Sequence, residues 1–297
     1  MRFIIDVLKY IKYLMYKVVY IFLQIPFRKV KILTDEETVE YLLKNKVSYS
    51  RFGDGEFNWI LKNKQNSFQD DNEEMANRMK EILLNSNDKV LIGIPLGLKK
   101  VSEFVLFTRK FWTYTFVRNY NKLLKYIPGK IYGNASVTRP YIDYKNRKNS
   151  MNKFINLKRL WDNKDVIIVE GEKTKIGVGN DLMDNAKSLK RIICPSKNAY
   201  GKYNEILETI KNDIDKDKLI LIALGPTATI LAYDLGQLDY QAIDIGHIDV
   251  EYEWCGKNVK DRVSLVGKSV NECKNSETEN MELTDKKYEE SILKKIL

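Results

Sequence analysis

Short runs of aliphatic and β-branched residues alternate along most of the chain with stretches in which apolar residues recur at helical spacing. The short apolar runs lie at 47–50, 90–94, 166–169, 191–194, 219–224 and 242–245, with a weaker one at 131–137. The helical patterns lie at 72–86, 98–126, 150–162, 180–189, 202–214 and 227–237. Nearly continuous apolar strands that alternate with helices are typical of a mainly parallel sheet covered by helices on both faces. The chain is therefore predicted to have an α/β fold of that kind.

The first 31 residues have a different pattern. The longest uncharged run in this segment, Val18–Phe27, has ten residues, whereas a membrane-spanning helix needs about 20. No small-residue cleavage site follows, so a secretory signal peptide is not expected. A polar stripe recurs at steps of three and four residues, at Arg2, Asp6, Lys9, Tyr13, Lys17, Tyr20 and Gln24. The stripe lies against a broad apolar face, which predicts an amphipathic helix.

A basic amphipathic helix with many aromatic residues is typical of the interface of an anionic membrane. The alternative is a helix that packs on the protein's own core or on a partner subunit. A second helix is expected to begin at Thr34, because Thr34 and Glu37 have the spacing of a capping box.

Amino-acid composition and charge limit the classes of protein to which the chain can belong. The apolar share of 44% and the charged share of 30% are those of an ordinary globular chain and exclude a disordered one. Of the net charge of +10, residues 1–31 carry +6, so the remaining 266 residues are only mildly basic. Nucleic-acid binders concentrate positive charge on the folded body, so no nucleic-acid partner is expected. Cys194, Cys255 and Cys273 lack metal-site or disulfide spacing and indicate free thiols in a reducing compartment.

Three segments follow from these patterns. Residues 1–31 are predicted to be a basic amphipathic membrane-interface helix, and residues 32–270 a single α/β domain. The chain from 268 onward is polar and rich in Lys and Glu, and the tail at 271–297 is expected to be loose with a weak final helix.

Glycine and polar residues follow the end of every predicted strand. These loops lie at 53–56, 95–97, 133–134, 170–172, 195–198, 225–227 and 244–247. In open α/β sheets ligands bind where such loops converge at the carboxyl ends of the strands. The sequence therefore predicts one crevice at that edge.

The first of these loops carries two carboxylates, Asp54 and Glu56, between glycines that permit unusual backbone angles and close approach of a ligand. Mg²⁺ and Mn²⁺ are commonly bound by one or two protein carboxylates together with substrate phosphates. An acidic turn without a ligand is the alternative.

Two glycine turns before predicted helices suit an anion. Gly177-Val178-Gly179 precedes Asn180, and a helix start of this kind directs backbone N–H groups toward a phosphate. It lacks the third glycine of a dinucleotide motif, so NAD binding is weakly supported. The second turn is Gly225-Pro226-Thr227-Ala228-Thr229. It suits close approach to a diphosphate or ribose, and a purely structural helix start is an equally good interpretation.

The run 244–253 contains the single histidine of the chain. If this run is extended, His247, Asp249, Glu251 and Glu253 share one face just after Asp244. Metal ligand, phosphate contact and general base are all open roles for this group, and a solvated acidic edge strand is the alternative. Elsewhere, Ser196, Lys197, Asn134 and Arg139 supply polar or cationic groups suited to phosphates or sugar hydroxyls.

Taken together, these segments resemble the glycosyltransferase family with the GT-D fold, formerly a domain of unknown function of bacterial surface-glycan clusters. The resemblance covers about 32–270. It rests on blocks at 51–56, 132–135 with 139–141, 177–181, 194–198, 225–229 and 244–249. It implies a Rossmann-like domain that transfers a sugar from a nucleotide-sugar donor with a divalent metal, and it puts the family's Asp-x-Glu metal motif on Asp54 and Glu56.

The expected function is thus a metal-dependent glycosyltransferase that moves a sugar, a hexose, from a UDP-linked donor to a cell-surface glycan or glycoprotein. Mn²⁺ or Mg²⁺ would be held by Asp54 and Glu56, and Asp244, Asp249 or Glu251 would activate the acceptor. The donor and its metal would be bound by Arg51, Gly53, Asn134, Arg139, Gly177, Gly179, Asn180, Ser196, Lys197, Gly225, Thr227 and His247.

The expected location is the inner face of the cell membrane, with an anionic membrane surface and a lipid-linked or protein-linked acceptor as partners, and a homo-oligomer is left open. The rival functions are a metal-dependent phosphoesterase and a non-catalytic membrane-tethered scaffold.

Overall fold

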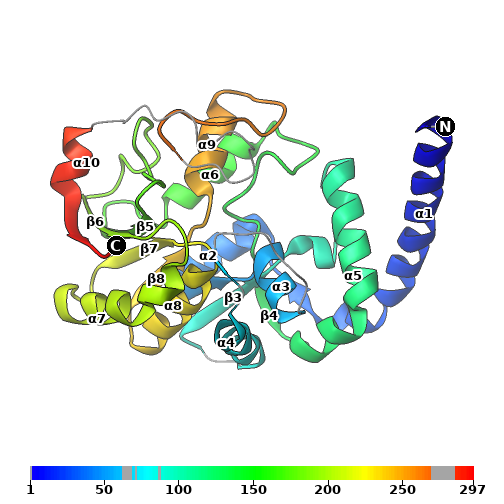
Figure 1. Cartoon of the computed structure of the whole chain (residues 1–297), viewed down its shortest axis with the longest axis horizontal. Coiled ribbons are helices and arrows are strands. Elements are labelled where there is room, and N and C mark those ends of the chain that lie inside the picture. Colours follow the sequence, from blue (N-terminus) through cyan, green and yellow to red (C-terminus); the bar gives the residue numbers. More distant parts are fainter. Residues whose placement is uncertain (1, 62–68, 71, 86–87, 269–284) are drawn as a thin grey trace.

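The described residues form one nine-stranded, entirely parallel sheet with helices on both faces (Figure 1). The computed structural model describes residues 2–61, 69–70, 72–85, 88–268 and 285–297. The strand order is β1-β4-β3-β2-β8-β7-β5-β6-β9. The strands are β1 Lys31–Ile32, β2 Ser48–Arg51, β3 Val90–Ile94, β4 Ile131–Asn134, β5 Asp165–Gly171, β6 Ser188–Cys194, β7 Leu219–Ala223, β8 Gln241–Asp244 and β9 Ile292–Lys295. The predicted α/β class and parallel sheet are confirmed.

The helices divide between the two faces according to the alternation of buried strand residues. The described helices are α1 Arg2–Leu23, α2 Asp35–Asn45, α3 Asp54–Ile60, α4 Glu73–Leu84, α5 Leu106–Tyr126, α6 Ser150–Lys158, α7 Tyr203–Asp213, α8 Pro226–Gln237, α9 Ile248–Gly256 and α10 Lys286–Ser291, with 3₁₀ turns at Pro26–Lys29, Leu96–Leu98 and Ala199–Lys202. Helices α2, α6 and α9 pack with Val166 and Ile168 of β5. Helices α7 and α8 pack with Ile167 and Val169, on the opposite face.

The chain reverses its direction of travel across the sheet between β2 and β8. Strands β3 and β4 extend the sheet on one side of β2, and β8, its other neighbour, joins it to β7, β5 and β6. Such a reversal is a topological switch point, where the loops at the carboxyl ends of the two central strands leave a crevice between them. The loops that follow Arg51 and Asp244 lie at this point.

Local sequence accounts for many of the helix boundaries. Thr34 and Glu37 form the predicted capping box at the start of α2, where the Glu37 N–H donates to Thr34 Oγ1 and the Thr34 N–H donates to Glu37 Oε2. Helix α8 approaches the sheet closely at Gly236, where an added Cβ would lie 2.5 Å from Val90 Cγ2. The predicted helix at 98–126 begins only at Leu106.

Two expectations about secondary structure are wrong. Residues 180–187 form turns rather than a helix. The Asn180 side chain accepts the N–H of Leu182 and so competes with helical hydrogen bonds, and the Asn185 amide ties the segment to the Lys158 carbonyl at the end of α6. The run after Asp244 is not extended. It forms α9, so Asp249 and Glu253 share a helical face while Glu251 points elsewhere.

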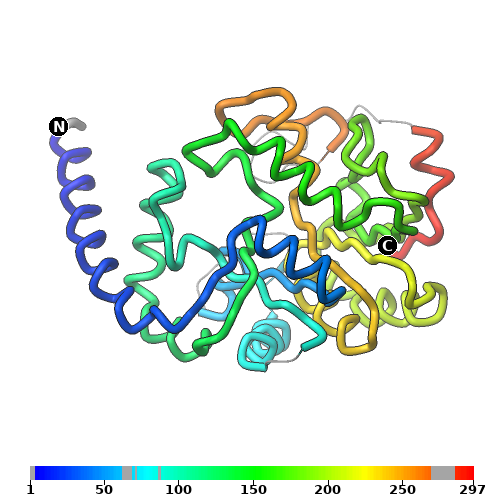
Figure 2. The backbone as a smooth tube through the Cα atoms, turned by 180° about the vertical axis from the view of Figure 1, so that it is seen from behind, coloured from blue at the N-terminus to red at the C-terminus, as the bar shows by residue number. Residues whose placement is uncertain are grey.

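The two ends of the described chain lie at opposite ends of the molecule (Figure 1, Figure 2). The last thirteen residues are not loose, because they contain α10 and β9. Strand β9 pairs with β6 as the ninth strand of the sheet. Arg191 of β6 holds this segment, because its Nε donates to Ser291 Oγ and its guanidinium lies 4.8 Å from the ring centroid of Tyr288. The predicted tail at 271–284 lies outside the described residues. No helix in the described part of the chain has both the length and the apolar character to cross a bilayer.

Candidate active site at the centre of the sheet

Arg51, the last residue of β2, ties together the strand ends at the switch point. Its Nε donates to the Asp244 carbonyl at 2.9 Å, and its Nη2 to Asp244 Oδ1 at 3.0 Å. Its Nη1 donates to the carbonyl of Ala135, just after β4, at 2.7 Å. Three of the five N–H groups of the guanidinium are thus bound within the protein, and they hold β2, β8 and the end of β4 in a fixed arrangement.

The loop after β8 closes over this guanidinium. Gly246 has φ +47°, and a Cβ at this position would lie 1.9 Å from Arg51 Nη2. Its N–H donates to Asp244 Oδ1 at 3.0 Å. Glycine is required here both by the left-handed backbone and by the close approach. His247 follows directly and is the residue before α9.

The two carboxylates of the predicted metal motif begin helix α3 rather than lying on a free turn. Asp54 is the exposed first residue of the helix, and Glu56 reaches back so that Oε2 accepts the N–H of Gly53 at 2.7 Å. Gly53 has an extended backbone with φ −86°, so its small size rather than a left-handed conformation matters here. Acids in a first helical turn are favoured by the helix dipole.

Glu56 has a strongly perturbed carboxyl. Its pKa is raised to about 7, chiefly by burial and also by the nearby carboxylates of Asp244 and Asp54, against the lowering effect of its hydrogen bonds. Asp244 is neutralised by Arg51. Among the described residues neither Asp54 nor Glu56 forms an ion pair with a basic side chain. The seam between β2 and β8 therefore holds an excess of negative charge.

This donor set fits a divalent cation of the Mg²⁺ or Mn²⁺ type. The described residues contain no group of three or more His, Cys, Asp or Glu side chains arranged to hold a metal ion by themselves. Two carboxylates on one helical turn match the mode in which substrate phosphates and water complete the coordination. Asp54 and Glu56 are the residues that would hold such an ion.

The amino terminus of α8 meets the same seam. Gly225 has φ +53°, and Pro226 begins the helix. Thr229 Oγ1 donates to the Arg51 carbonyl at 2.8 Å, and Ser50 Oγ donates to the Thr229 carbonyl at 2.7 Å. Thr227 is fully buried, and its Oγ1 has no hydrogen-bond partner among the described atoms. The positive end of the α8 dipole thus lies beside β2, where an anion would be stabilised.

The Gly177–Asn180 turn is tied to α9. The Gly177 N–H and the Asn180 amide both donate to Asp249 Oδ1, at 2.8 and 2.9 Å. Lys268 Nζ bonds to Asp249 Oδ2 and to Glu253 Oε1, each at 2.6 Å. These donors are therefore bound to a buried protein carboxylate, while Gly179, with φ +77°, has open space around it.

Several further predicted site residues lie in the framework. Glu251 is fully buried and accepts the N–H groups of Tyr141 and Ile142, at 3.2 and 3.1 Å. Arg139 lies 3.3 Å from Glu251 Oε1. Asn134 is fully buried and donates to Asp35 Oδ1 at 2.6 Å. These contacts explain the positions of the three residues without a ligand.

Ser196 and Lys197 follow β6, four strands from β2 along the edge, or about 19 Å at the usual strand spacing. Ser196 Oγ accepts the N–H of Lys173 at 3.1 Å. The structure thus brings Arg51, Gly53, Asp54, Glu56, Asp244, Gly225, Thr227 and His247 to the ends of three neighbouring strands. Sequence reasoning gave Gly246 no role and named Thr229 only as part of the turn expected to suit a diphosphate or ribose, because the contacts of both residues with Arg51 join positions far apart in the chain.

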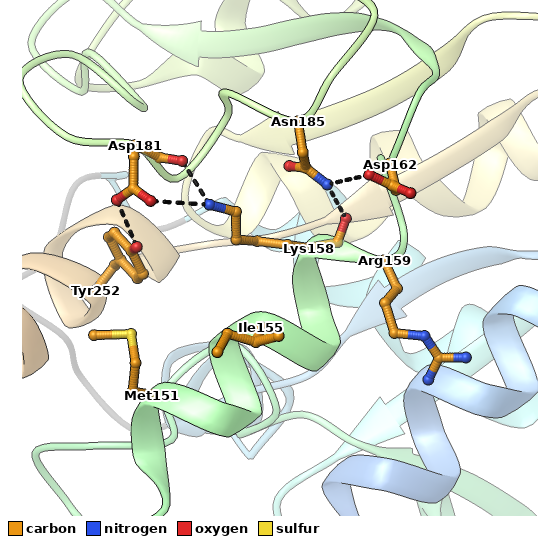
Figure 3. Close-up of a pocket in the computed structure, with 8 residues that line it drawn as sticks. All are labelled: Met151, Ile155, Lys158, Arg159, Asp162, Asp181, Asn185 and Tyr252. Atoms are coloured by element: carbon orange, nitrogen blue, oxygen red, sulfur yellow. Dashed lines mark hydrogen bonds and ion pairs between the residues drawn. The ribbon is translucent and has the colours of Figure 1, made fainter.

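A cavity of about 550 Å³ lies between α6 and α9, away from this seam (Figure 3). Lys158 and Tyr252 both point to the Asp181 carboxylate in its wall, with Tyr252 Oη 2.6 Å from Asp181 Oδ1. The remaining lining residues are Met151, Ile155, Arg159, Asp162 and Asn185. The cavity contains none of the predicted site residues, and its polar groups largely pair with one another.

Known proteins match most of the chain. Residues 49–273 match the family described as "Glycosyltransferase GT-D fold". The "Probable glycosyl transferase Gly" of Streptococcus gordonii is 37% identical over 239 residues, which cover 80% of this chain and 35% of that protein. The "Glycosyltransferase GlyD" of Streptococcus pneumoniae serotype 4 is 34% identical over 276 residues, 93% of this chain and 34% of that protein. The chain thus spans about a third of the length of these curated relatives.

Solved structures match over nearly their whole length. One is described as "The highly conserved domain of unknown function 1792 has a distinct glycosyltransferase fold". It has a TM-score of 0.85 at 38% identity and covers 91% of this chain and 96% of its own. Another, "A New Glycosyltransferase (DUF1792) from Streptococcus sanguinis", has a TM-score of 0.85 at 36% identity and covers 90% of this chain and 100% of its own.

Replacing Gly246 by Ala should separate Arg51 from Asp244. The left-handed backbone and the clash with Arg51 Nη2 are expected to lower the free energy of unfolding by about 2–3 kcal/mol, measured by urea denaturation. Gly201→Ala is the matched control, because a Cβ at Gly201 would meet no atom within 4 Å. Equal stability of the two variants would contradict the clamp.

The raised pKa of Glu56 predicts a pH-dependent stability. Its folded-state pKa of about 7 lies above the unfolded value, so folding favours the protonated carboxyl. This contribution to the free energy of unfolding is fully present below pH 4 and is lost as pH rises through 7. Between pH 5 and pH 8 the wild type should lose about 2 kcal/mol relative to Glu56→Gln, which keeps an acceptor for Gly53. Urea unfolding of both proteins across this range measures the difference, and parallel pH profiles would show that the carboxyl is not perturbed.

Proposed function

This chain belongs to the GT-D fold glycosyltransferase family, and we propose that it transfers a hexose from a UDP-linked donor to a cell-surface glycan or glycoprotein, using Mn²⁺ or Mg²⁺. The observation that carries the proposal is the pair Asp54 and Glu56, two carboxylates without a basic partner among the described residues, at the switch point of the sheet. The names of its relatives support the transferase activity. The metal is proposed from the chemistry of the site, and the UDP-linked donor from the family resemblance.

Asp54 and Glu56 would hold the cation. When bound, it would neutralise charge that develops on the diphosphate leaving group. The amino terminus of α8 lies beside the same seam and would direct its positive dipole end and the Gly225–Thr227 turn toward the diphosphate. Arg51 would position the site rather than bind the donor, since its guanidinium is committed to Asp244 and Ala135.

The acceptor base is proposed to be Asp244 if the reaction inverts. Asp244 lies close enough to Glu56 to raise its pKa. Asp249 is instead bound to Lys268, and Glu251 is fully buried beside Arg139. Burial raises the pKa of the Asp244 carboxyl against the lowering effect of the paired Arg51, and a raised pKa suits a carboxylate that accepts a proton.

We also place the reaction at the inner face of the cell membrane, where a lipid-linked or protein-linked glycan would serve as acceptor. The charge of +6 on residues 1–31 supports this location, because basic segments are attracted to anionic lipid.

Replacing Asp54 or Glu56 by Ala should lower the rate of sugar transfer at least 100-fold, because electrostatic stabilisation of the leaving group is lost. The measurement is release of UDP and mass-spectrometric detection of the glycosylated acceptor over a panel of UDP sugars, with and without Mn²⁺. Asp217→Ala, which removes an exposed acid away from the site, is the control.

Thermal shifts by donor and Mn²⁺ should occur in the wild type and in Asp217→Ala and should be absent in the other two variants. Near-normal transfer by Asp54→Ala or Glu56→Ala would refute the metal role. Donor hydrolysis that is independent of any acceptor would identify a phosphoesterase, and a wild type that responds to neither nucleotide nor metal would identify a scaffold.

A further inference from the structure

Helix α1 packs on the rest of the protein through a stripe of aromatic and amide side chains. The helix lies beside α5 at one end of the molecule (Figure 1, Figure 2). Tyr13 and Tyr20 are only 3% and 5% exposed. Tyr20 Oη donates to the Gly97 carbonyl, and Gln24 Nε2 donates to the Leu98 carbonyl at 2.8 Å. The helix is therefore held by one definite side.

That side is the one that the sequence pattern assigned to the polar stripe. Tyr13, Tyr20 and Gln24 belong to the predicted stripe, yet all three face the body of the protein. Tyr16 adds an edge-to-face contact with Tyr114 of α5, with ring centroids 4.9 Å apart. Long tyrosine side chains can bury their rings and still reach a polar partner, so a stripe that looks polar in sequence forms the packing surface.

The opposite side of α1 is a continuous apolar row. It consists of Ile4, Leu8, Ile11, Met15, Val18 and Phe22, each 48% to 66% exposed. These residues are spaced by four and three positions in turn and lie on one face of the helix. Eighteen residue steps at 1.5 Å give the row a length of about 27 Å. An exposed apolar surface of this length marks an interaction site.

The charge around the row identifies its occupant. Lys12 lies on the flank of α1 between the row and the tyrosine stripe, Lys9 and Lys17 extend from the stripe side, and Arg28 and Lys29 follow in the next turn. Among residues 1–31 these cations are opposed by Asp6 alone. A second copy of the helix would bring like charges together, whereas anionic headgroups would neutralise them.

We infer that the apolar row of α1 lies in the interface of an anionic bilayer, with the helix parallel to the membrane and its tyrosine stripe facing α5. Because the stripe is bound to the body, insertion is limited to the opposite side, and membrane binding fixes the orientation of the whole domain. This inference rests on the proposed membrane location and does not depend on the transfer chemistry.

The test is flotation of the full chain with vesicles of phosphatidylcholine containing 30% phosphatidylglycerol, and with vesicles of phosphatidylcholine alone. The row variant combines Leu8→Gln, Met15→Gln and Phe22→Gln. The matched control combines Ile155→Gln, Val266→Gln and Leu293→Gln, which remove equally exposed apolar side chains elsewhere. Circular dichroism verifies the helical content of each protein.

The wild type and the control should bind the anionic vesicles at least tenfold more tightly than the row variant, and added salt should weaken binding. Equal partitioning of the row variant and the wild type would overturn the inference. So would a wild type that ignores vesicles but forms a dimer that the row variant lacks, since a second copy would then cover the row. Vesicle binding needs neither donor nor metal, and the row variant should retain normal transfer to a soluble acceptor, so failure of the transferase proposal is distinguishable.

Discussion

The ion pair between Arg51 and Asp244 is the constraint on which the central site depends. Removing both charges from water is costly, and a buried pair is stable only when its remaining hydrogen-bonding capacity is satisfied. Here the guanidinium also binds two backbone carbonyls, and the Asp244 carboxylate accepts the Gly246 N–H. Because these partners come from β2, β8 and the end of β4, the pair joins the two halves of the sheet at the point where they meet.

Buried ion pairs of the same kind hold the rest of the carboxyl edge. Asp249 with Lys268 fixes the glycine turn at 177 against α9, and Glu251 with Arg139 fixes the loop after β4. Breaking such a pair by removing one partner leaves a buried charge uncompensated, so these acids are expected to be structural. An acid after a strand is therefore ambiguous in sequence, because the framework and the chemistry both need charge at this edge.

Most of the fold could be predicted from short-range pattern. Apolar runs located the central strands, and the capping box located α2, because both signals depend on neighbouring residues. The alternating acids of the run 244–253 suggested a strand, but from Ile248 onward the chain forms a helix, since Trp254 and Val250 pack into the core. The strand β9 could not be predicted, because an edge strand of Ile292-Leu-Lys-Lys gains its identity only by pairing with β6. The family resemblance, which combined many blocks, is confirmed.

Charge balance distinguishes the acids that serve the framework from those that could bind a ligand. Asp244, Asp249 and Glu251 each lie against a basic side chain of the protein, so their charges are compensated before any ligand binds. Asp54 and Glu56 have no such partner among the described residues, and burial, together with the nearby carboxylates of Asp244 and Asp54, raises the pKa of Glu56 to about 7. A carboxyl of this kind either holds a proton or binds a cation. A divalent cation would balance the two charges together, which is why the motif read from sequence and the electrostatics of the fold indicate the same two residues.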